Sequence, residues 1–220
     1  MGKQAQIGFF RRNGLSLVLL LLFLAFLAGQ VLTGFRASNE ERAEQGLAAE
    51  TMTAYLGSGH FISATFENWE SEFLQMGMYV LLSVSLRQKG SAESRPLDPN
   101  QENERIESGA LPWPVRAGGL WLKLYEHSLA IAFGGLFLLS FVLHLEGSWR
   151  HENVQRQLEG ELPLRVWDHL ASAQFWFESF QNWQSEFLAV ASLVLLTIFL
   201  RQKDSPQSKP VSAPHRQTGT

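Results

Sequence analysis

The stretch FENWESEFL, residues 66–74, occurs twice in this chain of 220 residues. It returns 114 positions later as FQNWQSEFL, residues 180–188. In each copy an apolar run follows, and each run stops at the basic triplet RQK, at residues 87–89 and 201–203. Over the 31 positions that begin with these stretches, 17 are identical without a gap. Chance does not produce such agreement, so the sequence predicts a tandem duplication of one membrane hairpin.

The chain alternates between very apolar and very polar blocks, although its mean hydropathy is close to zero. Residues 15–35 carry no charged side chain over 21 positions. At about 1.5 Å per residue, a helix of that length crosses a hydrocarbon core of roughly 30 Å. The length of the run and the lack of a small-residue cleavage pattern favour a retained span over a signal peptide, despite Arg11 and Arg12. We therefore predict an all-α integral membrane protein with four transmembrane helices.

The first hairpin is predicted to cover residues 1–89, with helices at about 15–35 and 59–88. Ser58 precedes the second of these helices and is a favourable N-cap residue. The chain between the two helices is acidic and polar, so we expect a loop outside the bilayer. Residues 90–115 are too polar and too rich in proline to bury a core, and they predict a disordered cytoplasmic linker.

The second hairpin is predicted to cover residues 116–203, with helices at about 120–145 and 174–202. Residues 204–220 are rich in proline and serine and predict a flexible cytoplasmic tail. Because both copies enter and leave the membrane in the same order, they are parallel repeats. Such repeats are related by a pseudo-two-fold axis along the membrane normal.

Basic residues give the predicted orientation of the chain. The segments assigned to the inner side, residues 1–14, 87–123 and 201–220, hold 13 of the 18 Lys and Arg residues. Cytoplasmic segments of membrane proteins carry such an excess of basic residues. We therefore expect both termini in the cytoplasm.

Polar residues within the predicted spans are the main candidates for a functional site. The candidate site consists of six side chains: Asn68, Glu72, Asn182, Glu186, Gln30 and His144. An ionisable group in a membrane helix costs about 2.5–3.5 kcal/mol at mid-bilayer and usually faces a bundle interior or a cavity. Both copies keep the glutamate at Glu72 and Glu186, so the two carboxylates would face each other across the pseudo-two-fold axis. This arrangement predicts a site for a proton or a cation.

The alternative for the same residues is structural. The carboxylates of Glu72 and Glu186 would bind water at the surface or accept hydrogen bonds from the asparagines. Trp69 and Trp183 would then belong to the belt of aromatic residues that anchors helices at the membrane interface. The repeated RQK triplets would be membrane stops.

Other chemistry has little support in the sequence. The chain has no cysteine, which excludes disulfides, thiolate metal sites and cysteine nucleophiles. The histidines lack metal-ligand spacing such as HExxH, and no phosphate-binding glycine loop, nucleophile elbow or dinucleotide fingerprint occurs. The net charge of −3 gives no indication of a nucleic-acid partner. We expect no enzyme activity, no catalytic residue, no metal and no cofactor.

The repeated stretch, together with RQKGSAES at residues 87–94, resembles a family of small bacterial membrane proteins that is defined only as a domain of unknown function. The resemblance extends from RNGLSL at residues 12–17 to SKP at residues 208–210. It implies a bacterial cytoplasmic membrane as the location. It brings no activity and no functional residues.

Two hypotheses for function follow. The first is a structural or partner-binding membrane protein, whose partners are the lipid bilayer and a second copy or another membrane protein. The alternative is a small proton or cation pathway, or a transporter, that uses Glu72 and Glu186 in a homodimer. An enzyme ranks third. The hypotheses differ in whether the two repeated stretches converge on a shared, water-accessible cavity.

Overall fold

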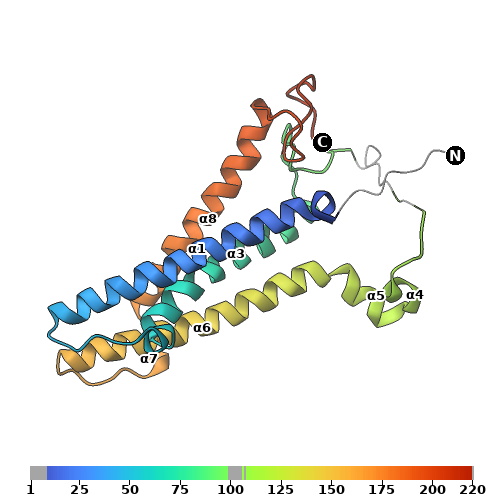
Figure 1. The fold of residues 1–220 in the computed structure, drawn as a ribbon. Coiled ribbons are helices and arrows are strands. Elements are labelled where there is room, and N and C mark those ends of the chain that lie inside the picture. The colour runs from blue at the N-terminus through green and yellow to red at the C-terminus, as the bar shows by residue number, and fades with distance from the viewer. Residues whose placement is uncertain (1–8, 99–105, 107, 220) are drawn as a thin grey trace.

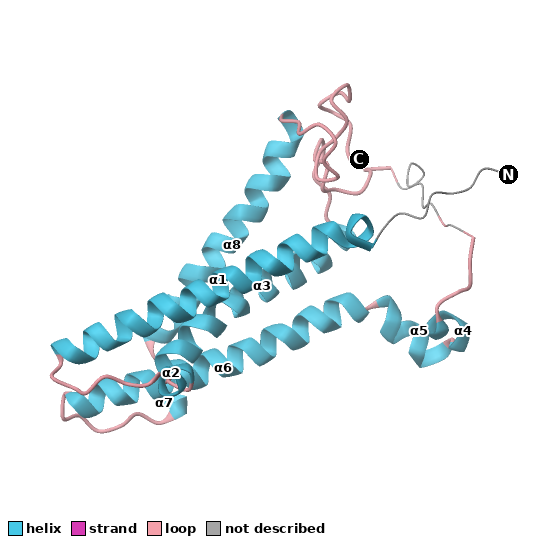
Figure 2. Ribbon diagram, in the orientation of Figure 1, coloured by secondary structure: helices cyan, strands magenta, loops and turns pink. Residues whose placement is uncertain are grey.

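The computed structural model describes residues 9–98, 106 and 108–219 (Figure 1). Throughout this described part the regular secondary structure is α-helix, without a strand (Figure 2). The remaining residues, 1–8, 99–105, 107 and 220, lie outside it. The predictions for the first residues of the chain and for the middle of the linker therefore fall outside the described residues.

Four long and four short helices make up the described chain. In order they are α1 (Phe9–Glu44), α2 (Met52–Leu56), α3 (Gly59–Ser85), α4 (Trp113–Ala117), α5 (Gly119–Glu126), α6 (Ser128–Leu158), α7 (Val166–Leu170) and α8 (Ala173–Phe199). The short helices α2, α4, α5 and α7 have between 5 and 8 residues. The long helices α1, α3, α6 and α8 correspond in order to the four predicted spans.

Helix ends in the two halves of the chain differ by the same 114 positions as the repeated stretches. Helix α1 ends at Glu44 and α6 at Leu158, and both ends of α2 and α3 recur at this spacing in α7 and α8. The helix caps correspond as well. The hydroxyls of Ser58 and Ser172 each accept the backbone N–H three residues ahead, at 3.2 and 3.3 Å.

Helices α1 and α6 extend past the apolar runs that predict them at 15–35 and 120–145, into chain assigned to the outer loops. Both end two residues before a glycine with left-handed backbone, Gly46 with φ 72° and Gly160 with φ 77°. Glycine adopts this conformation without steric cost and commonly follows the last residue of a helix. The apolar run therefore marks the part of the helix that suits lipid, whereas the glycine marks its end.

Among the described residues, three helical segments are long and apolar enough to cross a membrane. They are Arg12–Glu44 in α1, Ser128–Leu158 (α6) and Ala173–Phe199 (α8). Helix α3, the counterpart of the span predicted at 59–88, has the required length but is too polar to join this group.

The burial pattern of the long helices is the reverse of that in a water-soluble bundle. The buried side chains of α3 are all polar: Ser63, Thr65, Glu70, Ser71 and Gln75. The leucines, valines and phenylalanines of α1, α6 and α8 are mostly exposed. Lipid tails are as apolar as leucine, so burying leucine between membrane helices brings no hydrophobic gain. Membrane helices pack instead through small and polar residues. This pattern agrees with the three apolar spans.

Helix α3 is the central helix, with α1 and α6 on either side of it and α8 crossing its first half (Figure 1). It runs antiparallel to α6, and their backbones approach closely at Gly59 and Gly147. A Cβ atom on Gly59 would lie 2.6 Å from the carbonyl oxygen of Gly147 and 2.6 Å from the backbone nitrogen of His151. A Cβ atom on Gly147 would lie 2.9 Å from Cγ2 of Ile62. Only glycine at both positions permits this crossing.

The start of the linker packs against the C-terminal tail, where the sequence suggests a disordered linker and a flexible tail. Lys209 in the tail is buried, with an exposed fraction of 1%. Its Nζ donates to the carbonyl oxygens of Gly90, His215 and Gln217, the last two at 3.0 and 2.9 Å. Polar chain of this kind is held by hydrogen bonds to one buried ammonium group and not by an apolar core.

Candidate functional site

Glu70 of α3 and His144 of α6 form a fully buried pair, with both side chains at 0% exposure. The Nδ1 atom of His144 lies 2.8 Å from Oε2 of Glu70. Trp183 of α8 donates its Nε1–H to the other carboxylate oxygen, Oε1, at 2.9 Å. One carboxylate therefore connects three of the long helices, and both of its oxygens are hydrogen-bonded.

Helical periodicity explains why His144 lies at this interface. The buried residues of α6 are Ser140, His144, Gly147 and Ser148. They recur at positions i, i+4, i+7 and i+8, which form one face of a helix. Gly147 brings this face against α3, so His144, one turn away, points into the contact between the two helices.

Aromatic rings enclose the pair. The imidazole of His144 stacks on the ring of Phe175, with centroids 4.9 Å apart and an interplanar angle of 27°. Phe141 lies edge-on to Phe175 at 5.7 Å, and Trp176 lies edge-on to Trp183 at 6.2 Å. Rings in these places keep water away, and an electrostatic interaction is stronger in such low-dielectric surroundings.

The pair can hold one proton on either partner and stay neutral overall. A proton on His144 gives a carboxylate and an imidazolium, and a proton on Glu70 gives two uncharged groups. Burial tolerates either arrangement better than a lone charge. The Nε2 atom of His144 is buried and has no hydrogen-bond partner among the described residues. The cluster is thus able to crosslink helices or to exchange a proton.

The structure brings some of the predicted polar residues together. His144 belongs to the buried pair itself. Asn182 lies beside it, and its Nδ2 donates to Oε1 of Glu67 on α3. Gln30 of α1 donates to the hydroxyl of Thr65 on α3 at 3.2 Å. Each of these bonds joins α3 to a different long helix.

The other predicted residues lie apart from this cluster. Asn68 and Glu72 are exposed on α3, and Asn68 donates to the carbonyl oxygen of Ala64 in its own helix at 2.8 Å. Glu186 is half-buried on α8. The glutamate that the bundle encloses fully is therefore Glu70, whereas the side chain of the repeated Glu72 is exposed.

The two tryptophans predicted for the interface belt are both half-buried. Trp69 packs against Phe23 of α1 and Phe66 of α3, with ring centroids 5.9 and 5.1 Å away. Trp183 donates to Glu70 as described above. Both rings thus contact other helices, and their place at a membrane interface stays a prediction.

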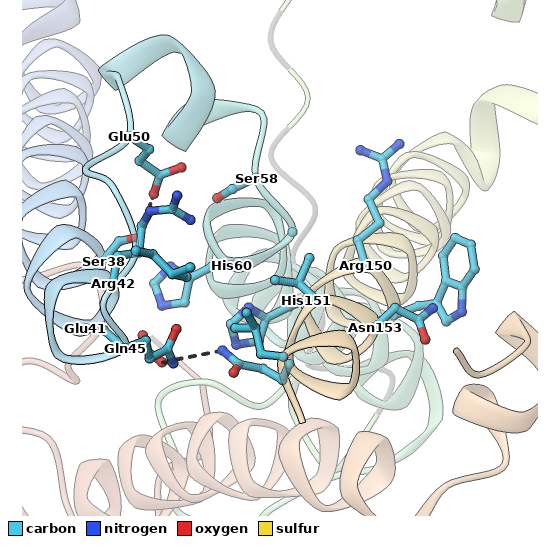
Figure 3. Close-up of a pocket in the computed structure, with 16 residues that line it drawn as sticks. Ser38, Glu41, Arg42, Gln45, Glu50, Ser58, His60, Arg150, His151 and Asn153 are labelled. Carbon is cyan, nitrogen blue, oxygen red and sulfur yellow. Dashed lines mark hydrogen bonds between the residues drawn. The ribbon is translucent and has the colours of Figure 1, made fainter. Parts of the chain in front are cut away.

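A second polar region is a pocket of about 460 Å³ between the C-terminal ends of α1 and α6 and the start of α3 (Figure 3). Charged and imidazole side chains in its wall include Glu41, Arg42, Glu50, His60, Arg150 and His151. The rings of His60 and His151 meet edge to face, with centroids 5.3 Å apart. Gln155 of α6 donates to Glu41 of α1 at 3.4 Å, so the pocket joins the two halves of the chain.

Several charges in this pocket already have partners. Ser38 donates to Glu50 at 2.6 Å, and Arg150 forms an ion pair with Glu146 at 2.5 Å. The described residues contain no group of three side chains able to hold a metal ion. We therefore regard the pocket as a polar junction between the two halves.

One family of proteins corresponds to nearly the whole chain. Its description is Domain of unknown function (DUF6766), and its model matches residues 6–220. The chain belongs to this family. No curated protein and no solved structure matches the chain significantly. The match to DUF6766 includes every helix described above, so the buried pair and the polar pocket both lie within the family's domain.

Sequence reasoning on this DUF6766 chain missed Glu70 and Glu67, because both are glutamines in the second copy. A signal for Glu70 was nevertheless present. At the 114-residue spacing, the pair Glu70 and His144 corresponds to Gln184 and Gln30. The two copies therefore differ at both partners of one contact, which is the pattern expected of residues that interact.

Proposed function

We propose that this DUF6766 chain is a four-span protein of a bacterial cytoplasmic membrane with a structural or partner-binding role. One observation carries the proposal: the buried carboxylate of Glu70 is hydrogen-bonded to His144 and to Trp183 inside the bundle. A binding or catalytic site instead presents its polar groups to a cavity. A second copy or another membrane protein is the partner we expect.

In this proposal α3 also crosses the membrane in spite of its polarity, which brings the number of spans to four. It has 27 residues, which is long enough for a hydrocarbon core of about 30 Å. Its Glu70 and Gln75 are buried against other helices, whereas Leu81 and Val84 farther along are exposed. A polar helix crosses a membrane when neighbouring spans cover its polar groups.

We further propose that the two hairpins arose by duplication and are inserted in parallel. The shared helix bounds support this, and so does the role of the RQK triplets. Arg87 donates to three carbonyl oxygens at the end of α3, at 3.0 to 3.1 Å, and Arg201 donates to the three equivalent oxygens of α8, at 2.8 to 3.3 Å. The outer loops agree too, because Asn39 and Asn153 each accept the backbone N–H eleven residues ahead at 2.7 Å.

The proposed topology has both termini in the cytoplasm. Since the chain has no cysteine, each single-cysteine variant reports on one position alone. In intact bacterial cells, a membrane-impermeant maleimide should label Gln45→Cys and Glu159→Cys. It should label Val211→Cys only after permeabilisation. Labelling of the tail from outside would reject this orientation.

The structural role is tested with purified protein in liposomes that hold a proton or potassium gradient. We expect the gradient to decay no faster than in empty liposomes. A faster decay of the gradient that depends on the protein would contradict the proposed structural role. A parallel crosslinking experiment in native membranes would show whether the partner is a second copy.

The alternative is a small proton or cation pathway, favoured by the buried pair of Glu70 and His144, which can exchange a proton. The sequence assigns this pathway to Glu72 and Glu186. Flux that disappears in Glu72→Gln/Glu186→Gln would support that assignment. Flux lost only in Glu70→Gln would place the pathway at the buried pair. Flux that every one of these variants retains would reject a carboxylate mechanism.

A further inference from the structure

Two short helices, α4 and α5, lie between the linker and α6 and extend away from the bundle (Figure 1). They contact each other, and α5 contacts α6. The sequence predicts a span that begins near residue 120, but the helix that crosses begins at Ser128. The chain bends at His127, where φ is −110° and ψ is 5°. Residues 113–126 are therefore a separate unit, which we call the α4–α5 hairpin.

Two consecutive glycines shape the α4–α5 hairpin. Gly118 and Gly119 have φ values of 64° and 56°, a conformation that other residues rarely adopt. The turn folds α4 back on α5, so the rings of Trp113 and Trp121 meet with centroids 5.2 Å apart. Both tryptophans nevertheless stay 55% exposed. The hairpin thus displays two joined indole rings on its surface.

The hairpin is amphipathic. Leu120, Trp121, Leu124 and Tyr125 are all exposed. At about 100° per residue they cover one side of α5, while Lys123 and Glu126 lie on the other. An exposed apolar face of this kind marks a contact with a membrane or with another protein.

The position of the hairpin indicates what covers it. Helix α6 starts two residues after α5 ends, and α6 is apolar enough to cross a membrane. The hairpin therefore lies at the depth where α6 leaves the hydrocarbon. Tryptophan and tyrosine are enriched at this depth, and arginine and lysine there attract anionic lipids. Arg116 and Lys123 provide such cations, and both are exposed.

We propose that the α4–α5 hairpin lies in the interface of the bilayer that α6 crosses, where Arg116 and Lys123 bind anionic phospholipid headgroups. The inference rests on the proposed membrane location of this chain. It adds a lipid-binding segment that does not span the membrane. The indole rings and leucines occupy the region just below the headgroups, and Lys123 reaches outward from it.

Depth of insertion tests the first part of the proposal. Leu120→Cys in the full chain, labelled with an environment-sensitive fluorophore, keeps both tryptophans in place. The protein is placed in vesicles whose lipids carry a quencher either near the headgroup or near the acyl-chain end. We expect stronger quenching by the quencher near the headgroup. Stronger quenching by the deep quencher would make α5 part of the span and overturn the proposal.

Two matched positions calibrate this measurement. Ile106→Cys, 84% exposed in the linker, should be quenched only from water, and Leu138→Cys, 61% exposed on α6, should respond to the deep quencher. If Leu138→Cys is not reached by lipid quenchers, the proposed membrane location itself fails. If Leu138→Cys responds but Leu120→Cys is quenched only from water, the membrane location stands and the interface proposal is rejected.

Lipid composition tests the second part. Acrylamide should quench the Leu120→Cys label less in vesicles with phosphatidylglycerol than in vesicles of phosphatidylcholine alone, by a factor of about two or more. Arg116→Gln/Lys123→Gln should abolish this difference. The control pair Lys89→Gln/Lys203→Gln, which changes two other exposed cations, should preserve it. Equal quenching of the parent protein in both vesicles, or an effect of the control pair as large as that of the hairpin pair, would overturn the binding of anionic headgroups.

Discussion

Both oxygens of Glu70 are hydrogen-bonded to other helices, so a substitution at this residue acts on two interfaces at once. Removing one partner of a buried charged pair typically costs about 3–5 kcal/mol, because the group that stays behind loses its hydrogen bond or keeps an uncompensated charge. We expect a loss of this order in the free energy of unfolding for Glu70→Gln and for His144→Gln. Denaturant unfolding in mild detergent measures it.

The double variant Glu70→Gln/His144→Gln distinguishes a pair from two independent effects. It replaces the pair by two neutral glutamines. Glutamine also stands at the two equivalent positions of the repeat, Gln184 and Gln30. We expect it to recover most of the stability lost in either single variant, since no unpaired charge remains. Glu72→Gln is the control and should change stability by less than about 0.5 kcal/mol, because that side chain is exposed. Additive losses in the double variant would mean that the two side chains act separately.

We expect His169 in α7 to make the stability of the molecule depend on pH. It is buried, and its Nε2 lies 2.9 Å from the hydroxyl of Ser148. Burial lowers the pKa of His169. The carboxylates of Glu152 and Glu178 act against this shift, and the nearby His144 adds a smaller effect in the same direction as burial. Below the unfolded value of about 6.5, the unfolded state binds more protons, so stability falls as the pH falls through that value.

The variant His169→Gln should remove this part of the acid sensitivity. The midpoint of thermal unfolding, compared between about pH 8 and about pH 5.5, should drop less in the variant than in the parent. His127→Gln changes an exposed histidine outside α7 and should leave the drop as it is. An equal drop in the parent and in His169→Gln would show that other groups carry the pH dependence.

At the scale of elements, the close crossing of α3 and α6 depends on two glycines. A Cβ atom on Gly147 would meet both backbone and side-chain atoms of Ile62, at 3.0 and 2.9 Å. We expect Gly147→Ala to push the helices apart and to cost about 1–3 kcal/mol, as overpacking of a tight contact does. Gly135→Ala on the same helix is the matched control, since nothing lies within 4 Å of its Cβ position.

Two measurements decide this prediction. Unfolding in detergent should be easier for Gly147→Ala than for the parent, whereas Gly135→Ala should be unchanged or more stable because alanine favours a helix by about 0.8–1 kcal/mol over glycine. A spin-label distance between α3 and α6 should lengthen only in Gly147→Ala. Equal behaviour of the two variants would show that α3 and α6 do not need glycine at their crossing.

The apolar runs and the helix caps predicted the long helices well, but they predicted the contacts between these helices less well. Ser58 marks the start of α3 because an N-cap is a local signal within one turn of the chain. The C-terminal ends of α1 and α6 were not predicted, because the start of polar sequence was taken as the end of each helix, whereas the signal lay in Gly46 and Gly160. The role of Glu70 was not predicted, because its burial depends on which helices pack against one another. Periodicity alone does not specify that contact.

For the whole molecule, Lys209 joins the end of the first half to the end of the second. Its ammonium group donates to carbonyl oxygens of the linker and of the tail, and the amide of Gly90 donates to the hydroxyl of Thr218 at 2.9 Å. We expect Lys209→Met to release this contact. Amide hydrogen exchange at residues 90–92 should become about tenfold faster, which corresponds to the loss of one or two hydrogen bonds.

Lys89→Met is the control for this experiment, since that lysine is exposed in the same part of the chain. It should leave exchange at residues 90–92 as in the parent. If Lys209→Met also leaves exchange unchanged, the tail does not hold the linker in solution. Exchange that is fast already in the parent would lead to the same conclusion.

The positions that correspond to Gly59 and Gly147 in the repeat do not hold glycine. At the 114-residue spacing, the equivalent positions hold Ala173 and Thr33. Two first halves brought together would set Thr33 against Gly59, and two second halves would set Ala173 against Gly147. In either combination a side chain occupies the space that the close crossing needs.

The two halves are therefore no longer interchangeable, although each still carries the same stretch, caps and loop turns. Each half provides one side of the joint and lacks the other, as the two unlike subunits of a heterodimer do. Here a single polypeptide contains both. The joining segment then guarantees equal numbers of the two unlike halves in every molecule that is made.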